Sequence, residues 1–207
     1  MVSRFLVVQS LFLAHNPYMI ASPKIVAILA GGKAMRFGGR DKGEILIKGQ
    51  RLIDIIHARL QPQSDNIIIS GSQDYGLGLA VVPDNNKAPG GPVGGIYSLW
   101  KCLDQKCVQG FFTAAIDGPN LPCDLTHKLY VKDSSSIAAD GKGRHPTYGW
   151  WRMEDLSKVF KDTAPANSFS LNRLADLAGA KTIAWDGDKN FININHLKDL
   201  NNFVKGA

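Results

Sequence analysis

An apolar run that breaks into a glycine-rich loop constrains this chain more than any other stretch. Residues 25–43 read IVAILAGGKAMRFGGRDKG. The branched residues from Ile25 to Leu29 are typical of a short strand buried on both faces. Gly31 and Gly32 remove the β-carbons where the chain must turn, so backbone N–H groups can approach an anion. Four cationic side chains follow, at Lys33, Arg36, Arg40 and Lys42. Such a loop is a chemically reasonable host for the phosphates of a nucleotide.

Two common nucleotide-binding loops are excluded by the spacing within this stretch. The Walker sequence GxxxxGK[ST] is absent, because Lys42 is followed by Gly43 and not by serine or threonine. The dinucleotide fingerprint G-x-G-x-x-G cannot be threaded through the glycines of the loop. Composition alone leaves two interpretations open: a phosphate-binding loop, and an ordinary strand-to-helix connection with solvated charges.

The segments that follow alternate between strand-like and helix-like patterns. We expect an extended piece at 44–48, strands at 66–70, 79–82 and 111–116, and helices at 52–60 and 96–103. This alternation predicts a parallel sheet with right-handed crossovers. We therefore expect an α/β fold with three layers, a Rossmann-like and mainly parallel sheet with helices on both faces. Ligands of such sheets bind outside the carboxyl ends of the strands.

The second half of the chain has a looser pattern. We expect a helix from 123 to about 132, a strand at 136–140, a loop at Arg144-His145-Pro146 and an extended aromatic segment at 148–151. Helices near 154–161 and 170–178, a strand at 182–185 and a closing helix complete the predicted elements. Trp150 and Trp151 have two interpretations, stacking on a flat ligand or core packing, and core packing is favoured.

The composition suits one domain that binds a small anionic substrate. The 207 residues have 44% hydrophobic content, enough to bury a core, and a net charge of +6. No basic run of the nucleic-acid type is present, so we expect neither a nucleic-acid nor a membrane partner. Three cysteines, at 102, 107 and 123, are expected to be small buried thiols in a reducing compartment, which predicts a cytoplasmic protein.

Residues 1–18 differ in character from the rest of the chain. Arg4 followed by the apolar residues 5–14 resembles a short signal-peptide core, but Gln9 and Ser10 interrupt it and no clear cleavage site follows. The apolar run is too short to span a bilayer. We expect an N-terminal extension at 1–18, either dispensable or the product of an over-long gene start, and a single domain at 19–207.

Asp117 is the most informative acidic residue. It follows an apolar strand, so its carboxylate is expected at the same rim of the sheet as the glycine-rich loop. Magnesium binds through one or two carboxylates and otherwise uses water and phosphate oxygens. We expect Mg²⁺ at Asp117; the alternative is a carboxylate that caps the following turn.

Several motifs together resemble a known family. Residues 29–42 are similar to LAGGxxxRMGGxDK, the opening signature of the molybdenum cofactor guanylyltransferases, with Phe37 in place of the methionine. Residues 90–96 are similar to that family's GPLxG(I/M) loop, and Asp117-x-Pro119-x-x-Pro122 resembles its DxPxLP segment. His145-Pro146 resembles its HP pair, where the histidine either contacts an incoming phosphate or has only a structural partner.

The family's last motif is matched in part. Residues 191–195 resemble the start of FxNxNTPEDL, but His196-Leu197-Lys198 replaces Thr-Pro-Glu. An asparagine that the family has after its second strand is replaced by Ser72, and a hydroxyl offers one donor where an amide offers two. The resemblance spans about 25–200, with five motifs in the family's order.

The resemblance implies a nucleotidyltransferase with a fold like that of the nucleotide-diphospho-sugar transferases. Such an enzyme transfers GMP from GTP to the molybdenum-molybdopterin cofactor, releases pyrophosphate and uses Mg²⁺. A GTP site is implied at Leu29, Ala30, Gly31, Gly32, Lys42, Asp84, Gly94 and Asp117. Catalytic roles are implied for Arg36, Lys42 and Asp117, and metal binding for Asp117 and Asn195. A molybdoenzyme or cofactor-delivery protein would be a transient partner.

Two alternatives remain open at this point. A related transferase that uses CTP or a sugar-phosphate acceptor would keep Gly31, Lys42 and Asp117 and would differ around Ser72 and Asp84. A catalytically silent nucleotide-binding module would retain the fold without the reaction.

Overall fold

The strands of the chain form one large mixed sheet. The computed structural model describes residues 24–31, 41–103, 108–162, 169–187, 190–194 and 197–206. Within these residues seven strands lie in the order β5-β4-β1-β6-β8-β7-β9. They are β1 (Ile25–Leu29), β4 (Asn66–Ser70), β5 (Ala80–Val82), β6 (Gly110–Ala115), β7 (Ser136–Asp140), β8 (Gly143–Arg152) and β9 (Lys181–Ala184). A small hairpin of β2 (Leu46–Ile47) and β3 (Gln50–Arg51) stands apart from this sheet.

All strands of the large sheet except β8 run in one direction. β1 pairs in parallel with β4 and β6, β4 with β5, and β7 with β9. β8 lies antiparallel between β6 and β7. The carboxyl ends of six strands and the beginning of β8 therefore share one edge of the sheet, which we call the carboxyl edge. The predicted mainly parallel α/β fold is confirmed.

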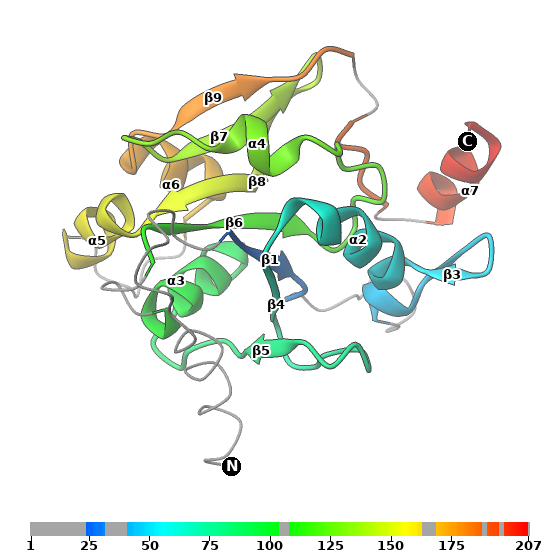
Figure 1. The fold of residues 1–207 in the computed structure, drawn as a ribbon, viewed down its shortest axis with the longest axis horizontal. Helices are drawn as coiled ribbons and strands as arrows, with labels where there is room; N and C mark the ends of the chain where they lie inside the picture. The colour runs from blue at the N-terminus through cyan, green and yellow to red at the C-terminus, as the bar shows by residue number, and fades with distance from the viewer. Residues whose placement is uncertain are drawn as a thin grey trace.

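Helices cover both faces of the sheet (Figure 1). One face packs against α2 (Leu52–Leu60) and α4 (Leu125–Leu129), and the other against α3 (Pro92–Cys102), α5 (Met153–Asp162) and α6 (Leu171–Leu177). Two short 3₁₀ helices, η2 (Lys42–Glu44) and η3 (Gln61–Gln63), and the last helix α7 (Leu197–Gly206) complete the described elements. The result is the expected three-layer arrangement.

The central strand is buried on both faces, as its sequence predicts. Val26 and Ile28 belong to the core on the α2 face, whereas Ile25 and Ala27 belong to the core on the α3 face. The two tryptophans of β8 alternate in the same way: Trp150 packs on Phe112 in the first core, and Trp151 lies in the second. Both indoles are almost fully buried, so core packing is confirmed as their role.

Several element boundaries differ from the sequence predictions; the helix predicted from 123 to about 132, for example, covers only Leu125–Leu129. The predicted loop at 144–146 is instead part of β8, and the β7–β8 register shifts between Ile137 and Ala138. This irregularity leaves a place for Pro146, which has no N–H to donate to a ladder. The helix expected at 96–103 begins earlier, at Pro92, whose fixed φ angle suits the first helical position.

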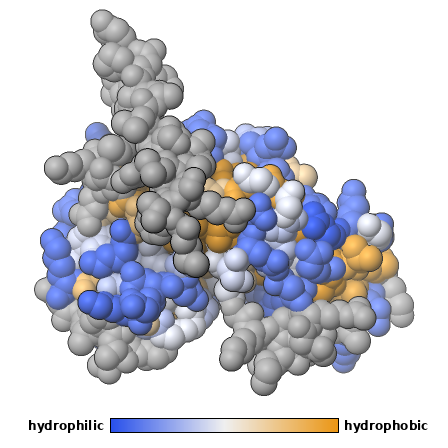
Figure 2. Space-filling model, turned by 90° about the horizontal axis from the view of Figure 1, so that it is seen from below, coloured by the Kyte–Doolittle hydropathy of each residue, from blue (hydrophilic) through white to orange (hydrophobic). Residues whose placement is uncertain are grey.

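The surface of the described part is mostly polar. Seen from below, hydrophilic residues predominate, with hydrophobic ones gathered near the middle and at the right (Figure 2). None of the helices in the described ranges is both long and apolar enough to cross a bilayer. The expectation of buried thiols was wrong for Cys123, which is exposed, while Cys102 is half-buried. Cys107 and the predicted N-terminal extension lie outside the described residues.

Candidate functional site

An ion pair between two distant parts of the chain lies at the carboxyl edge. Lys42 Nζ is 2.7 Å from Asp117 Oδ2, and the two side chains are 27% and 14% exposed. Lys42 begins η2 after the glycine-rich loop, and Asp117 follows β6. Because β1 and β6 are parallel neighbours, the loops that follow them meet. The structure thus brings together two of the three residues for which a catalytic role was predicted.

A hydrogen-bond network around Asp41 fixes the backbone next to Lys42. Asp41 Oδ1 accepts hydrogen bonds from Gly43 N (2.8 Å) and the Tyr75 hydroxyl (2.9 Å), and Oδ2 accepts one from Gln73 Nε2 (3.0 Å). Burial, followed by the bond to Asp41, raises the pKa of Tyr75, so its hydroxyl stays protonated and donates. A side chain at Gly43 would collide with the Tyr75 ring. The segment at 41–43 is therefore anchored to the segment that follows β4.

Sequence reasoning missed this anchor. Asp41 belongs to the Asp-Lys pair of the opening motif, which was a signal that it has a role of its own. Gln73 and Tyr75 lie outside any regular element and follow no periodic pattern. Tyr75 also has a φ of +56°, a conformation that side chains rarely adopt. No sequence pattern predicts such a residue.

The loops after β1 and β5, which are predicted to bind the nucleotide, lie side by side. A β-carbon built on Gly31 would lie 4.0 Å from Asp84 Oδ2, so the loops after β1 and β5 meet. Asp84 and Ser72 are both exposed. The Ala30 N–H donates to Ser70 O at 2.9 Å, and Leu29 O accepts from Ile116 N at 3.3 Å. The Ala30 N–H is therefore used within the sheet, and nucleotide binding at Leu29, Ala30 and Gly31 stays a prediction.

Gly94 has a role in packing that the sequence did not reveal. It lies buried in the first turn of α3, and a β-carbon there would overlap Pro89 O. Gly95 is equally restricted, because its β-carbon would lie 2.9 Å from Ser70 Oγ. The lack of side chains at these positions is explained by close chain approach. Gly90 and Gly91, just before the helix, are the exposed glycines of this loop.

Three of the predicted site residues lie outside the described part of the chain. They are Gly32, Arg36 and Asn195. The segment leading to Asn195 is nevertheless tied to the site, because Ile194 N donates to the backbone carbonyl of Asp117 at 2.8 Å. Residues 191–194, the described part of the closing motif, therefore end next to the backbone of Asp117.

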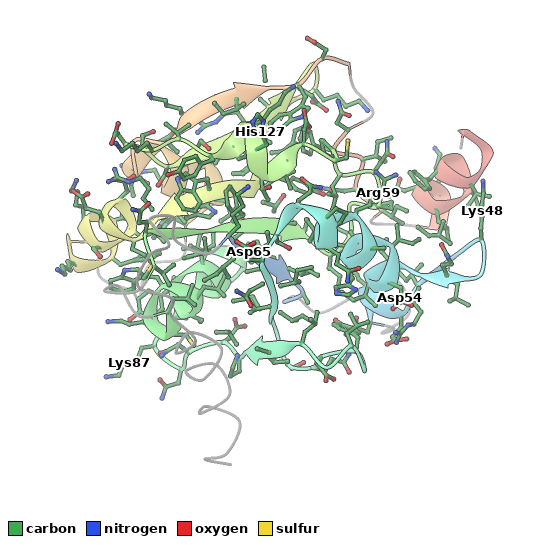
Figure 3. The ribbon with its side chains drawn as sticks, in the orientation of Figure 1. Lys48, Asp54, Arg59, Asp65, Lys87 and His127 are labelled. Carbon is green, nitrogen blue, oxygen red and sulfur yellow. The ribbon has the colours of Figure 1, made fainter. Side chains whose placement is uncertain are left out.

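Side chains of α2 and of η3, which follows it, hold the loop after Asp117 in place. Arg59, which projects from that helix in Figure 3, donates through Nη1 to Leu121 O at 3.0 Å and through Nη2 to Asn120 Oδ1 at 3.4 Å. Gln63 Nε2 donates to Pro122 O at 2.9 Å. These contacts tie the 120–122 segment to the helix layer, which restricts the position of Asp117 three residues earlier.

The donor set at this edge supplies only part of a magnesium coordination shell. Within the described ranges, no group of three or more His, Cys, Asp or Glu side chains is placed to hold a metal ion. Asp117 supplies a carboxylate, and Asn193 Oδ1 is buried without a hydrogen-bond partner. Magnesium commonly takes one or two protein oxygens and completes its shell with phosphate oxygens and water. The residues present fit a magnesium ion that arrives with a nucleotide.

His145 is held by a carboxylate from the neighbouring strand. Its Nε2 lies 2.8 Å from Asp140 Oδ1, and its ring packs on Phe191 with centroids 4.9 Å apart. Burial opposes the charge of Asp140, but hydrogen bonds from His145 and from Lys142 N hold the pKa of Asp140 below its usual range. The histidine therefore has a structural partner, which was one of its two predicted interpretations.

Comparison with known proteins identifies clear relatives. The MobA-like NTP transferase domain matches residues 26–169. A molybdenum cofactor guanylyltransferase of Nitrobacter hamburgensis is 30% identical over 186 residues, covering 84% of this chain and 89% of the relative. One from Serratia proteamaculans is 33% identical over 180 residues, covering 83% and 89%.

Solved structures share the fold at lower identity. Molybdopterin-guanine dinucleotide biosynthesis protein A from Archaeoglobus fulgidus superposes with a TM-score of 0.60 at 18% identity, covering 87% of this chain and 97% of that one. The inositol-1-phosphate CTP transferase from T. maritima gives a TM-score of 0.67 at 14% identity, covering 90% and 95%. The arrangement of the sheet and its helices is common to both.

Proposed function

This chain belongs to the family of MobA-like NTP transferase domains, and from that premise we propose that it transfers GMP from GTP to the molybdenum-molybdopterin cofactor. Pyrophosphate is the second product. The chain is thus a nucleotidyltransferase of the molybdenum cofactor guanylyltransferase type, as its relatives from Nitrobacter and Serratia are named.

The observation that carries this proposal is the Lys42–Asp117 pair at the carboxyl edge. A cation and a carboxylate 2.7 Å apart lie where parallel sheets bind ligands, and the loops of Gly31 and Asp84 meet at the same edge. A triphosphate needs positive charge and free N–H groups, whereas its metal needs a carboxylate. This edge offers the cation and the carboxylate, and the N–H groups are proposed to come from the glycine-rich loop.

The reaction is an in-line displacement at the α-phosphorus of GTP. An oxygen of the acceptor's terminal phosphate forms the new bond to the α-phosphorus, and the bond between the α-phosphorus and the bridging oxygen to the β-phosphate breaks. Pyrophosphate leaves with that oxygen and the electron pair. Such transfers depend mainly on positioning and charge compensation. Lys42, and Arg36 from the same loop, offset the charge that develops on pyrophosphate.

Magnesium is assigned to Asp117 and the closing asparagine motif. When bound, it neutralises phosphate charge and orients the α-phosphate oxygens. Asn195 was predicted as its second protein ligand, and Asn193, two residues earlier, offers a buried amide oxygen in the same segment. Asp117 holds its position through the Lys42 contact and through the backbone bond from Ile194 N.

Guanine is read by the loops after β4 and β5. Ser72 and Asp84 are exposed there, and Asp84 can accept hydrogen bonds from a base edge or a ribose hydroxyl. Ser72 replaces the asparagine of the family pattern, so the preference for guanine rests on fewer side-chain contacts.

Two alternatives, a transferase that uses CTP and a silent nucleotide-binding module, are separated from this proposal by the two experiments described next. Cytoplasmic location and a transient molybdoenzyme partner remain predictions.

The test measures magnesium-dependent pyrophosphate release in wild-type protein, Lys42→Ala and Lys132→Ala. Lys132 is an exposed lysine that precedes β7, at the edge of the sheet opposite the site, and serves as the matched control. We expect Lys42→Ala to lose at least about 100-fold in turnover while its melting temperature stays close to that of wild type. Unchanged turnover in Lys42→Ala would overturn the assignment.

The base is tested by titration calorimetry with GTP, CTP, ATP and UTP in the presence of magnesium. We expect GTP to bind most tightly. Tighter binding of CTP would favour the related transferase, and binding without pyrophosphate release would favour the silent module.

A further inference from the structure

Two buried side-chain oxygens without hydrogen-bond partners lie close to Gly118, the residue after Asp117. Across the described residues, three buried side-chain oxygens lack a hydrogen-bond partner: Asp140 Oδ2, Tyr148 Oη and Asn193 Oδ1. A β-carbon built on Gly118 would overlap Tyr148 Oη and would lie 3.6 Å from Asn193 Oδ1. Tyr148 and Asn193 therefore reach the same small region, next to the residue that follows Asp117.

The tyrosine is held rigidly in this place. Tyr148 belongs to β8, a strand that lies beside β6 in the sheet (Figure 1). Its side chain is fully buried. Its ring packs on Phe191 with centroids 4.9 Å apart, and Phe191 also packs on Trp185 and His145. Gly118 leaves room for the hydroxyl because it has no side chain. The hydroxyl thus points out of the core toward the loop that carries Asp117.

Such an arrangement is costly unless a ligand is present. A buried hydroxyl without a partner destabilises a protein by about 1 to 3 kcal/mol, and phenylalanine would fill the same space without that cost. Burial, and then the negative charge of Asp117, raises the pKa of Tyr148, so the hydroxyl is neutral and both donates and accepts. Asn193 Oδ1 accepts only. The pair is suited to a bound water.

We propose that Tyr148 and Asn193 together hold a water of the hydrated divalent cation that binds at Asp117. The inference rests on the proposed metal role of Asp117 and adds Tyr148 as a positioning residue. Magnesium dehydrates reluctantly and usually keeps several waters in protein sites. When a residue that hydrogen-bonds to the ligands of a metal is removed, the metal affinity typically falls 10- to 100-fold.

The test is Tyr148→Phe in the full chain, with Mn²⁺ alone as the probe. Free Mn²⁺ is measured by electron paramagnetic resonance during titration, and thermal unfolding is measured without metal. We expect the dissociation constant for Mn²⁺ to rise about tenfold. The melting temperature without metal should be unchanged or higher, because the variant no longer buries an unpaired hydroxyl. Asn193→Ala should weaken Mn²⁺ binding in the same sense and tests the site independently of how Tyr148→Phe folds.

Two further variants make the outcomes distinguishable. Tyr97→Phe removes a hydroxyl from a tyrosine in the opposite core, where its ring packs on Trp100 and Phe160, and should leave Mn²⁺ binding unchanged. If Asp117→Asn weakens Mn²⁺ binding but Tyr148→Phe and Asn193→Ala do not, the inference fails and the proposed metal site stands. If Asp117→Asn leaves Mn²⁺ binding unchanged, the proposed metal role of Asp117 fails with it. A lower melting temperature of Tyr148→Phe with unchanged Mn²⁺ affinity would assign the hydroxyl to folding and would also overturn the inference.

Discussion

At the scale of single residues, the ammonium group of Lys42 lies beside Asp117, where the proposed function places a metal ion. Its ammonium group lies 2.7 Å from the carboxylate, and both side chains are largely sheltered from solvent. A cation in that position offsets the negative charge of the carboxylate before any ligand binds. When a triphosphate binds, its negative oxygens compete for Lys42 and leave Asp117 available to a metal. Nucleotide and metal should therefore bind cooperatively.

This arrangement predicts the effect of Lys42→Met on metal binding. Removing the competing charge should tighten Mn²⁺ binding to the nucleotide-free protein about tenfold. The free energy of a tenfold change is smaller than the attraction between two close, partly exposed charges. Affinity for GTP should fall in the same variant. Both constants are measured by titration, with Lys132→Met as the exposed control. Weaker or unchanged Mn²⁺ binding in Lys42→Met would show that the lysine does not compete with the metal.

At the scale of elements, the start of α3 shows why a glycine motif does not identify a ligand contact by itself. Gly94 matches the family's base-loop motif, yet the space beside it is filled by the backbone carbonyl of Pro89. Gly91, with a φ of +74°, turns the chain into the helix. The loop at 88–91 therefore packs tightly on the first turn of α3, and this packing holds the exposed Gly90–Gly91 edge in place.

Gly94→Ala tests this explanation. The new methyl group would overlap Pro89 O, so the loop or the helix must shift, and we expect a loss of about 1 to 3 kcal/mol in the free energy of unfolding. Chemical denaturation measures it. The ratio of affinities for GTP and CTP should stay as in wild type. A stable variant with an altered base ratio would instead assign Gly94 to base recognition.

The hairpin of β7 and β8 depends on a buried carboxylate. The Asp140 side chain is 1% exposed and accepts hydrogen bonds from Lys142 N and from His145. Burial opposes its charge, but these bonds lower the pKa of Asp140 below the ordinary 3.8. A carboxylate with a lowered pKa stabilises the fold fully above its ordinary value, and the effect is lost as pH falls through the lowered value.

The expected result is a difference in the pH dependence of stability. As the pH falls below the ordinary pKa of 3.8, wild-type protein should lose more stability than Asp140→Asn, which has no proton to gain at this position. Urea unfolding at several pH values measures the two curves. Parallel curves over this range would mean that Asp140 is not stabilised by its bonds in the folded state.

At the scale of the whole molecule, the two halves of the sheet supply different parts of the site. The loops after β1, β4 and β5 contribute Gly31, Lys42 and Asp84, which face the nucleotide in the proposed function. The other half, β8 and the segment at 190–194, contributes Tyr148 and Asn193. Asp117 follows β6, the strand between these halves. The metal site is thus proposed where the two halves of the molecule meet.

The predicted domain limits are tested by truncation. The first described strand begins at Ile25, and the family match begins at residue 26. A chain that starts at Met19 should therefore keep the melting temperature of the full protein within about 2 °C, a change of less than about 0.5 kcal/mol. Its turnover should be unchanged. A marked loss of stability or turnover would show that residues 1–18 belong to the working protein.

The sequence by itself determined the local structure and the class of site. Branched residues at 25–29 and 66–70, helical spacing at 52–60 and an aspartate at the end of an apolar run are patterns of burial and turn chemistry, and these are encoded locally. They predicted the layered α/β fold and the edge that carries the candidate site. The opening motif and the later ones predicted the family.

Only the tertiary structure decided which groups are partners. Lys42 meets Asp117 across 75 positions because β1 and β6 are neighbours in the sheet, an order that no local pattern encodes. In the same strand order, the Ala30 N–H donates a hydrogen bond within the sheet, and Tyr148 Oη lies next to the loop that carries Asp117. Hydrogen bonds and close approaches depend on distances between elements, whereas a sequence pattern records only which way each side chain faces.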